Sequence, residues 1–122
     1  MRDKVRGVLD QCPAEIAVAV IGGYWKITIV KYLAEGTLRF SELDRRLPRV
    51  TARMLTRQLR ELEEDGVVTR TVYPQVPPKV EYSLSETGRT LVPLVAALDA
   101  WGADYARRQP RAEASSRRAV KA

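Results

Sequence analysis

The sequence of 122 residues contains no histidine and only one cysteine, Cys12. Without histidine, no catalytic triad with an imidazole base is available, and a single thiol excludes nearly all zinc sites. A glycine-rich phosphate loop is also missing, because Gly22-Gly23 is followed by Tyr24-Trp25 and not by a lysine or a third spaced glycine. We therefore expect no enzymatic activity, no catalytic residue, no metal and no cofactor.

Long apolar runs are lacking too. The longest, from Ile16 to Ile21, is far shorter than the roughly 20 residues that span a bilayer. The first four residues carry charges of both signs and no apolar stretch with a cleavage site follows, so we expect no secretory signal. One cysteine cannot form a disulfide within the chain. We expect a cytoplasmic protein.

Positive charge is in excess but unevenly distributed. The formal net charge is +6, of which residues 107–122 alone carry +5. Within the remaining chain, the stretch from Arg39 to Arg60 has seven arginines against Glu42 and Asp44, a net charge of +5. A basic patch confined to one structural unit is expected where a protein binds the phosphate backbone of a nucleic acid.

Hydrophobic periodicity predicts short helices followed by a hairpin. A short helix, opened by Phe40 or by Ser41 as its N-cap, meets a longer helix that Thr51 caps and Asp65-Gly66 ends. A short helix, a tight turn and a longer helix form the helix-turn-helix pattern. Strands at 67–73 and 79–84 flank a proline-rich loop, which makes a wing. Further helices are predicted at 13–21, at 24–34 and from residue 85 onward, with a very short strand at 37–39.

These elements predict an α+β fold that is mostly α, a winged helix-turn-helix. The chain divides into an N-terminal arm at 1–9, the winged helix-turn-helix domain with its C-terminal helix at 10–106, and a basic tail at 107–122. The tail is rich in proline, alanine, serine and arginine and has no periodicity, so we expect it to be disordered.

The helix from Thr51 to Asp65 carries charge on one face only. At about 100° per residue, its three leucines fall on one side and three arginines on the other. The acids gather at its C-terminal end, which opposes the helix dipole, so local helix stability does not explain the pattern. A solvated surface is the plain alternative, but such a surface usually mixes signs at i, i+4. An anionic partner such as double-stranded DNA explains the face better. The leucines are Leu55, Leu59 and Leu62, and the arginines are Arg53, Arg57 and Arg60.

Recognition helices place their N-terminal residues at base edges in the major groove, while phosphate contacts position the protein. We therefore assign base or groove contact to the first half of this helix and backbone contact to its surroundings. The DNA-binding residues of the recognition helix are Thr51, Arg53, Thr56, Arg57 and, toward phosphate, Arg60. The DNA backbone residues are Ser41, Arg45, Arg46, Arg49 and, in the wing, Lys79 and Gln75, with plain surface exposure as the alternative for Lys79.

An ordered series of motifs resembles the HxlR-type winged helix-turn-helix regulators over residues 10–105. The resemblance implies a homodimer that binds inverted-repeat operators, often near its own gene, and whose first and last helices form the dimer interface. The motifs are Cys12-Pro13, Ile21-Gly22-Gly23-Tyr24-Trp25-Lys26, Arg39-Phe40-Ser41-Glu42-Leu43, Arg53 to Glu63, Asp65 to Arg70, and Tyr73 to Gly88.

The last helix independently suggests a dimer. Its apolar positions are spaced by three and four and form a stripe that is larger than one small monomer can bury. Packing within one chain is the alternative. The predicted interface consists of Leu91, Leu94, Val95, Leu98, Trp101 and Tyr105.

Cys12 corresponds to a position at which some members of the resembled family sense oxidants or electrophiles. A thiol at a helix N-terminus has its thiolate favoured by the dipole, and Arg2, Lys4 and Arg6 are possible helpers. The alternative is a half-buried cysteine without a sensing role.

Two other functions stay open. A winged helix can be a protein-interaction module that never reads DNA, but then the face opposite Leu55 and Leu59 would be apolar. A regulator can also bind a small-molecule effector, here near Trp25, Tyr32 and Trp101, although these aromatic residues fit a plain core as well. The leading prediction is a cytoplasmic, nucleoid-associated transcriptional regulator, and a repressor more readily than an activator.

Overall fold

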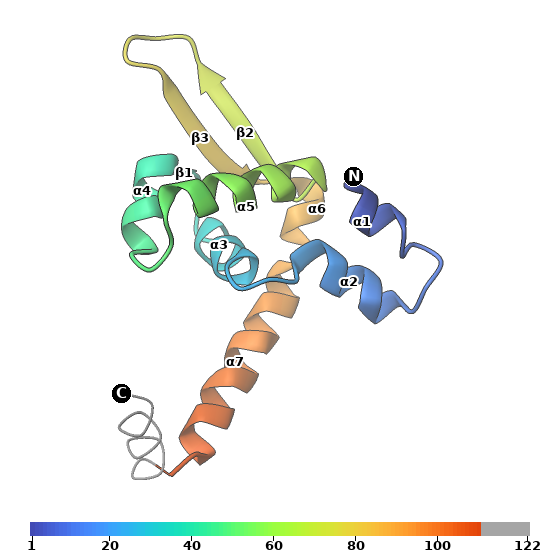
Figure 1. Ribbon diagram of the computed structural model, residues 1–122. Helices are drawn as coiled ribbons and strands as arrows, with labels where there is room; N and C mark the ends of the chain where they lie inside the picture. The colour runs from blue at the N-terminus through green and yellow to red at the C-terminus, as the bar shows by residue number, and fades with distance from the viewer. Residues whose placement is uncertain (111–122) are drawn as a thin grey trace.

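The computed structural model describes residues 1–110. Helices surround a small three-stranded antiparallel sheet, the long hairpin of β2 and β3 projects as a wing, and α7 extends away from the body (Figure 1). This architecture confirms the predicted α+β, mostly α, winged helix-turn-helix. The elements are α1 (Asp3–Arg6), α2 (Pro13–Ile21), α3 (Lys26–Leu33), β1 (Leu38–Arg39), α4 (Phe40–Arg46), α5 (Ala52–Glu64), β2 (Val68–Tyr73), β3 (Lys79–Leu84), α6 (Glu86–Arg89) and α7 (Val92–Arg108).

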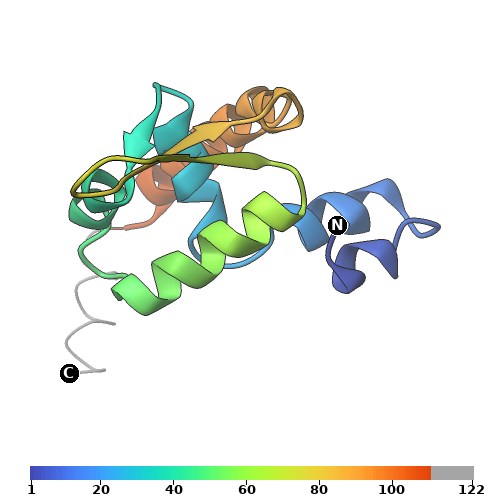
Figure 2. The same ribbon diagram turned by 90° about the horizontal axis from the view of Figure 1, so that it is seen from above.

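The core lies where α3, α5 and the sheet meet. The leucines predicted to face inward from α5, at positions 55, 59 and 62, are all buried, at 0%, 1% and 0% exposure. They pack with Ile29 and Val30 of α3 in a single apolar cluster. The strands run in the order β1-β3-β2, with Leu38 opposite Tyr82 and Val68 opposite Leu84. The sheet therefore closes one side of the core and the buried face of α5 another. The opposite face of α5 is left outward (Figure 2).

Several helix ends differ from the prediction. Ser41 is not an N-cap, because α4 begins at Phe40 and the Glu42 carboxylate accepts a hydrogen bond from the Arg39 N–H at 2.9 Å. Helix α3 begins at Lys26, two residues later than predicted, because the preceding turn places Gly23 at φ +124°. Backbone of this sign is accessible to glycine at no steric cost.

The predicted last helix is two helices. Helix α6, capped by Ser85, is followed by a break at Thr90-Leu91 before α7 begins at Val92. Pro93 explains the break, because it has no N–H to donate to the residue four positions earlier and its ring crowds that carbonyl. Leu91 is therefore the residue before α7 and not part of it.

The N-terminal segment, predicted as an arm at 1–9, is bound to the body of the domain. Val5 of α1 is buried at 3% exposure, and the backbone N–H of Arg2 donates to Asp65 Oδ1 at 2.8 Å. At the other end, α7 continues through Arg107 and Arg108, so two residues assigned to the tail are helical. Residues 111–122, the rest of the predicted basic tail, lie outside the described residues.

Within residues 1–110, no single helix is long and apolar enough to cross a membrane. Only α2 and α3 taken together pass by length and composition, and they are bent by 79°.

Candidate nucleic-acid interface

Helix α5 begins and ends where its sequence predicts. The Thr51 hydroxyl oxygen accepts a hydrogen bond from the Met54 N–H at 3.1 Å and so satisfies one of the free donors of the first turn. After the C-cap Asp65, Gly66 takes φ +75°, the left-handed conformation that commonly ends a helix. The two caps fix which residues α5 turns outward.

The outward face of α5 is basic. Arg53, Arg57 and Arg60 are all exposed, and the side chain of Arg57 retains 71% exposure. Among the described residues, Arg53 and Arg60 enter no ion pair. Thr56 is half-buried and its hydroxyl donates to the Ala52 carbonyl at 2.8 Å, so its donor is already used within the helix. Arg53 and Arg60 are therefore free to meet an anion, and Arg57 is held only by a contact of 3.6 Å with Glu61.

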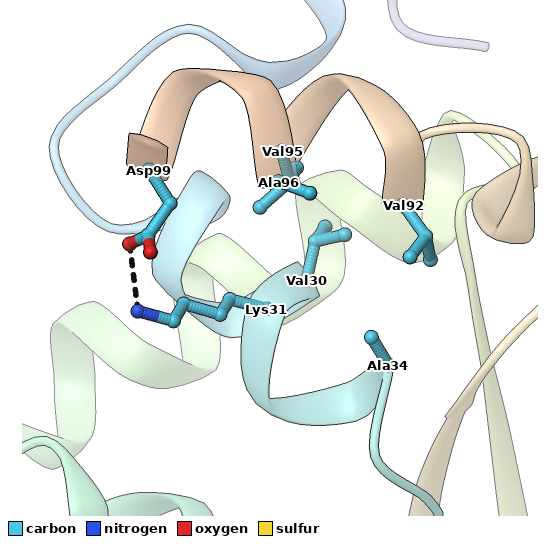
Figure 3. Close-up of a pocket in the computed structure, with 7 residues that line it drawn as sticks. All are labelled: Val30, Lys31, Ala34, Val92, Val95, Ala96 and Asp99. Carbon is cyan, nitrogen blue, oxygen red and sulfur yellow. Dashed lines mark hydrogen bonds and ion pairs between the residues drawn. The ribbon is translucent and has the colours of Figure 1, made fainter. Parts of the chain in front are cut away.

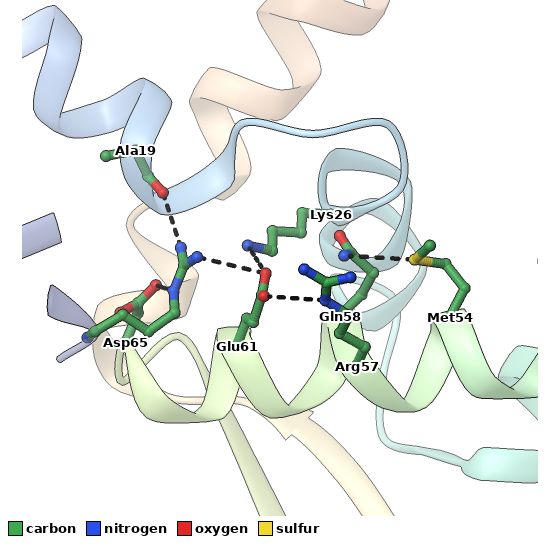
Figure 4. A network of polar contacts seen from close by, with 8 residues as sticks. Ala19, Lys26, Met54, Arg57, Gln58, Glu61 and Asp65 are labelled. Carbon is green, nitrogen blue, oxygen red and sulfur yellow. Dashed lines mark hydrogen bonds and ion pairs between the residues drawn. The ribbon is translucent and has the colours of Figure 1, made fainter. Parts of the chain in front are cut away.

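Glu61 serves the interior rather than the surface, which sequence reasoning missed when it grouped this residue with the other acids of α5. Its carboxylate accepts from the Lys26 ammonium at 2.7 Å, and it also meets Arg2 at 3.4 Å and Arg57 at 3.6 Å (Figure 4). Lys26 is a buried cation, with 3% exposure. A buried charge is tolerated only when it is paired. The pair therefore fixes α5 against α3.

Arg2 fastens the N-terminal segment to the end of α5. Its guanidinium donates from Nε to Asp65 Oδ2 at 2.7 Å and from a terminal nitrogen to the Ala19 carbonyl at 2.8 Å (Figure 4). These contacts join residues 63 and 17 positions apart, and no local sequence pattern predicts them. Arg2, Lys26, Glu61 and Asp65 form an ionic cluster that holds α1, α2, α3 and α5 together.

We predict a specific acid sensitivity from this ionic cluster. Hydrogen bonding from Lys26 is the main cause that lowers the pKa of Glu61 below its ordinary value of 4.5. Because the folded state favours the ionised carboxylate, its contribution to stability is complete above pH 4.5 and is lost as the pH falls through the lowered pKa. Urea unfolding should show the wild type to be more stable than Glu61→Gln at pH 7, with the difference shrinking below pH 4.5. Other acids titrate in both proteins, so their effects cancel when the two free energies of unfolding are subtracted. A difference in stability that did not change with pH would contradict this assignment.

The residues predicted to contact the DNA backbone differ in how far they are exposed or already paired within the chain. Ser41 and Arg45 are exposed on α4. Arg46 lies 3.5 Å from the Glu35 carboxylate and 5.6 Å above the ring centre of Tyr32, so it is partly engaged within the chain. In the wing, the Lys79 ammonium is 3.5 Å from Glu81 and 4.8 Å from the ring of a neighbouring tyrosine. Gln75 lies in the exposed wing tip.

Arg49, in the turn before α5, has aromatic partners that sequence reasoning did not assign to the interface. Its guanidinium lies 5.3 Å from the ring centre of Trp25 and 5.8 Å from that of Tyr24, and it donates a hydrogen bond to the Tyr24 hydroxyl at 3.2 Å. Guanidinium groups stack favourably on aromatic faces. The turn between α2 and α3 is thereby joined to the N-terminal end of α5.

This geometry is that of a helix-turn-helix with a basic recognition helix, and comparison with known proteins gives it a family. The family described as HxlR-like helix-turn-helix matches residues 20–110. The chain belongs to the HxlR family. It is 46% identical over 121 residues to YdeP, an uncharacterized HTH-type transcriptional regulator of Bacillus subtilis, with 94% of each chain covered. It is 52% identical over 98 residues to an HTH-type transcriptional regulator of Methanothermobacter thermautotrophicus, covering 80% of this chain and 75% of the relative.

Solved structures show the same relationship. The redox regulator HypR in its oxidized form has a TM-score of 0.73 and 55% identity, covering 76% of this chain and 96% of HypR. Diamide-treated YodB from B. subtilis has a TM-score of 0.66 and 34% identity, covering 78% of this chain and 95% of YodB. The family consists of transcriptional regulators, so this HxlR protein is a DNA-binding transcriptional regulator and not an enzyme.

The last helix of this HxlR protein carries an exposed apolar stripe, defined here as Leu94, Leu98, Trp101 and Tyr105. Their exposures are 40%, 41%, 68% and 53%, and the rings of the last two stack at 5.2 Å. Two residues of the predicted interface lie elsewhere. Val95 is 3% exposed in the core of its own chain, and half-buried Leu91 packs against that core, because both face the body at the start of α7.

Cys12 is exposed and directly precedes α2, with Pro13 as the first helical residue. Two of the three cations expected to assist it are committed elsewhere. Arg2 is bound to Asp65, and Arg6 pairs with Asp3 at 2.6 Å. The accessible thiol therefore stands at the N-terminal end of a helix, and the charges of these two arginines are already paired with carboxylates.

Small-molecule binding near Trp25, Tyr32 and Trp101 receives no support, because these side chains do not converge. The first two pack against the core, while Trp101 is exposed on α7. A cavity of about 230 Å³ lies instead between α3 and α7 (Figure 3). It is mostly apolar, with an ion pair of 2.7 Å between Lys31 and Asp99 at its side.

Proposed function

We propose that this HxlR regulator binds an inverted-repeat operator as a homodimer, with α5 of each subunit in the major groove, and that it represses transcription. The observation that carries the proposal is the face of α5 with Arg53, Arg57 and Arg60 outward, opposite three buried leucines. A helix whose leucines are fixed in the core presents these guanidinium groups together on its outer face. Repression needs only that the bound dimer occupies promoter DNA, whereas activation needs a further contact with RNA polymerase, so repression is the simpler mode of regulation for this small domain.

Base reading and backbone contact are divided along this surface. Arg53 and Arg57, near the N-terminal half of α5, suit base edges, where a bidentate arginine–guanine pair discriminates by about 1–3 kcal/mol. Thr51 and Thr56 line the same half, with contact through the threonine methyl as the remaining role for Thr56. The phosphate contacts come from Arg60, Arg49, Arg45, Arg46, Ser41 and Lys79.

Two subunits give two such surfaces. The exposed apolar stripe of α7, with α2 of the partner, forms the proposed dimer interface, and two-fold symmetry then makes the two half-sites inverted. Recognition helices about 34 Å apart meet successive major grooves on one side of the duplex. In this proposal the protein is cytoplasmic and binds the DNA of the nucleoid.

The competing function, a protein-interaction module, fits the surface less well. Such a module would present apolar side chains opposite Leu55 and Leu59, and this chain presents arginines there. Arg53 and Arg60 enter no ion pair among the described residues, and Arg57 meets only Glu61, at 3.6 Å, so the row keeps an excess of positive charge that favours a polyanion over a protein groove.

The proposal is tested by selecting bound sequences from sheared genomic DNA with the purified protein at two salt concentrations. We expect enrichment of an inverted repeat whose affinity falls with salt, because phosphate contacts release counterions. Enrichment of single half-sites only, or none at all, would contradict the dimeric reading.

We also propose that Cys12 makes operator binding sensitive to oxidants or electrophiles. The exposed thiol at the start of α2 supports this, as does the similarity to the redox regulator HypR and to diamide-treated YodB. The thiol can form a disulfide with the same thiol of the partner subunit, or with a small thiol, as it is oxidised by diamide.

Diamide treatment is therefore expected to change operator affinity of the wild type several-fold and to leave Cys12→Ser unchanged. The shift should reverse when dithiothreitol reduces the disulfide. Fluorescence anisotropy with the selected operator measures both proteins side by side. Equal responses of the two proteins would show that Cys12 is not the sensor.

A further inference from the structure

We propose that Tyr24 is a further DNA-contacting residue, which together with Arg49 binds one phosphate of the operator backbone in each half-site. This inference rests on the proposed function, because a phosphate reaches this site only when α5 lies in the major groove of the operator. It adds the turn between α2 and α3 to the DNA-binding surface, a segment that belongs to neither the helix-turn-helix nor the wing.

The turn that carries Tyr24 lies against the flank of α5. Gly23 lies close to the Gln58 side chain, since a Cβ built there would be 3.7 Å from its amide oxygen. The groove between turn and helix is lined on the turn side by Tyr24 and on the helix side by Met54, Arg57 and Gln58. Figure 4 shows this turn running beside α5 above the same residues. Tyr24 thus stands at the edge of the basic face.

The turn has little freedom to move away. A Cβ at Gly22 would come within 2.2 Å of the Val18 carbonyl oxygen, so the chain leaves α2 in close contact with that helix. Directly after the turn, Lys26 is fixed by its 2.7 Å ion pair with Glu61. A short segment held at both ends places the Tyr24 ring at a defined position relative to α5.

The chemistry of the pair favours an anion. The Tyr24 hydroxyl oxygen accepts a hydrogen bond from Arg49, so its own proton points elsewhere and is available to an acceptor. Tyr24 is 75% exposed, which leaves this proton facing solvent. The other N–H donors of Arg49 remain available to the same acceptor. A phosphate oxygen can accept from the hydroxyl and from the guanidinium together, and charge-assisted bonds of this kind are stronger than neutral ones.

Trp25 and the Tyr24 ring also fix Arg49 in place. The guanidinium lies over both rings, 5.3 Å and 5.8 Å from their centres, and the rings themselves meet edge to face at 4.8 Å. Removing the Tyr24 hydroxyl alone leaves this stacking intact. The two roles of Tyr24, direct donation and support of Arg49, are therefore separable by substitution.

The test compares Tyr24→Phe, Tyr24→Ala and Arg49→Ala on the selected operator. Tyr24→Phe should weaken binding about tenfold, the product of roughly threefold in each half-site for a lost hydrogen bond. Its salt dependence should stay unchanged, because no charge is removed. Arg49→Ala should lower the slope of log K against log salt by about 0.9 per half-site. Tyr24→Ala should weaken binding further than Tyr24→Phe, because Arg49 loses a stacking partner.

Tyr32→Phe is the matched control. Tyr32 also lies beneath an arginine, with Arg46 at 5.6 Å from its ring centre, but it is half-buried. Its substitution keeps the ring beneath Arg46 and removes a phenol hydroxyl that does not belong to the site of Tyr24 and Arg49, so operator affinity should be unchanged.

A scan of the operator with single methylphosphonates identifies the phosphate. At one position per half-site the wild type should lose affinity while Tyr24→Phe loses less, since that contact is already gone. Affinity equal to wild type for Tyr24→Phe, or the same loss at every methylphosphonate, would overturn the proposal. Failure of the wider proposed function is visible separately as a lack of sequence enrichment. The comparison can then be made on random-sequence duplex, because phosphate contacts do not depend on sequence.

Discussion

The double substitution Arg53→Ala and Arg57→Ala should weaken operator binding by at least two orders of magnitude and remove the preference for the operator over random DNA. Each arginine that reads a guanine contributes about 1–3 kcal/mol of discrimination, and the dimer presents each of them twice. Both side chains project from the exposed face of α5. Leu55 and Leu59 behind them are fully buried, so the helix keeps its position in the variant.

The control for this experiment removes the same charge elsewhere. Arg89→Ala with Arg108→Ala takes away two exposed arginines from α6 and from the end of α7. It should reduce affinity little and leave sequence preference intact. Competition binding with the operator and a scrambled duplex separates the two effects. If the Arg53 and Arg57 variant kept both affinity and target choice, α5 would not be the reading element.

The double substitution Leu98→Asp and Trp101→Asp should convert the dimer into a folded monomer with greatly weakened binding. Both side chains belong to the exposed apolar stripe of α7, at 41% and 68% exposure, so charges there cost the single subunit little. In a dimer the same charges would face each other in an apolar interface, where unpaired charge is strongly unfavourable. Losing the second half-site removes an avidity gain of about 10²–10⁴.

Sedimentation equilibrium gives the oligomeric state, and operator titration gives the affinity. Ala100→Asp is the matched control, because Ala100 is exposed on α7 but lies away from the stripe. It should leave the protein dimeric with unchanged affinity. A stripe variant that remained dimeric, with wild-type binding, would place the interface elsewhere on the molecule.

The ionic cluster of Arg2, Lys26, Glu61 and Asp65 links the recognition helix α5 to the N-terminal segment. Glu61 meets buried Lys26 at 2.7 Å on one side and exposed Arg57 at 3.6 Å on the other. Arg57 has the longest of these contacts and is the most exposed partner, so it can move to a base without disrupting the interior pair. The segment that carries Cys12 is tied to the same cluster by Arg2. The proposed oxidant site and the reading helix therefore share one anchored framework.

Much of the helix-turn-helix could be predicted because its signals are local. The leucines at three- and four-residue spacing, the Thr51 cap and Gly66 act within a few residues, and the structure confirms all of them. The basic face of α5 follows directly, because it is whatever the buried leucines leave outward. The alternation of the hairpin strands is local in the same sense.

Other features were decided by competition between neighbouring residues or by contacts between distant segments. Ser41 looked like a cap, but the Glu42 carboxylate, three residues from Arg39, accepts the Arg39 N–H and closes the turn one residue earlier. Val95 fitted the exposed stripe by spacing, yet the break before α7 turns it into the core. The roles of Arg2 and Glu61 appear only when segments some 60 residues apart meet.

Residue pattern and motifs are enough to predict the winged helix-turn-helix, its family and the charge of its recognition face, because periodicity and caps act over one or two helical turns. Which charges turn inward, where the last helix breaks and how Tyr24 meets Arg49 emerge only from the folded chain. Those outcomes depend on which distant segments pack together, and local patterns of residues do not specify that packing.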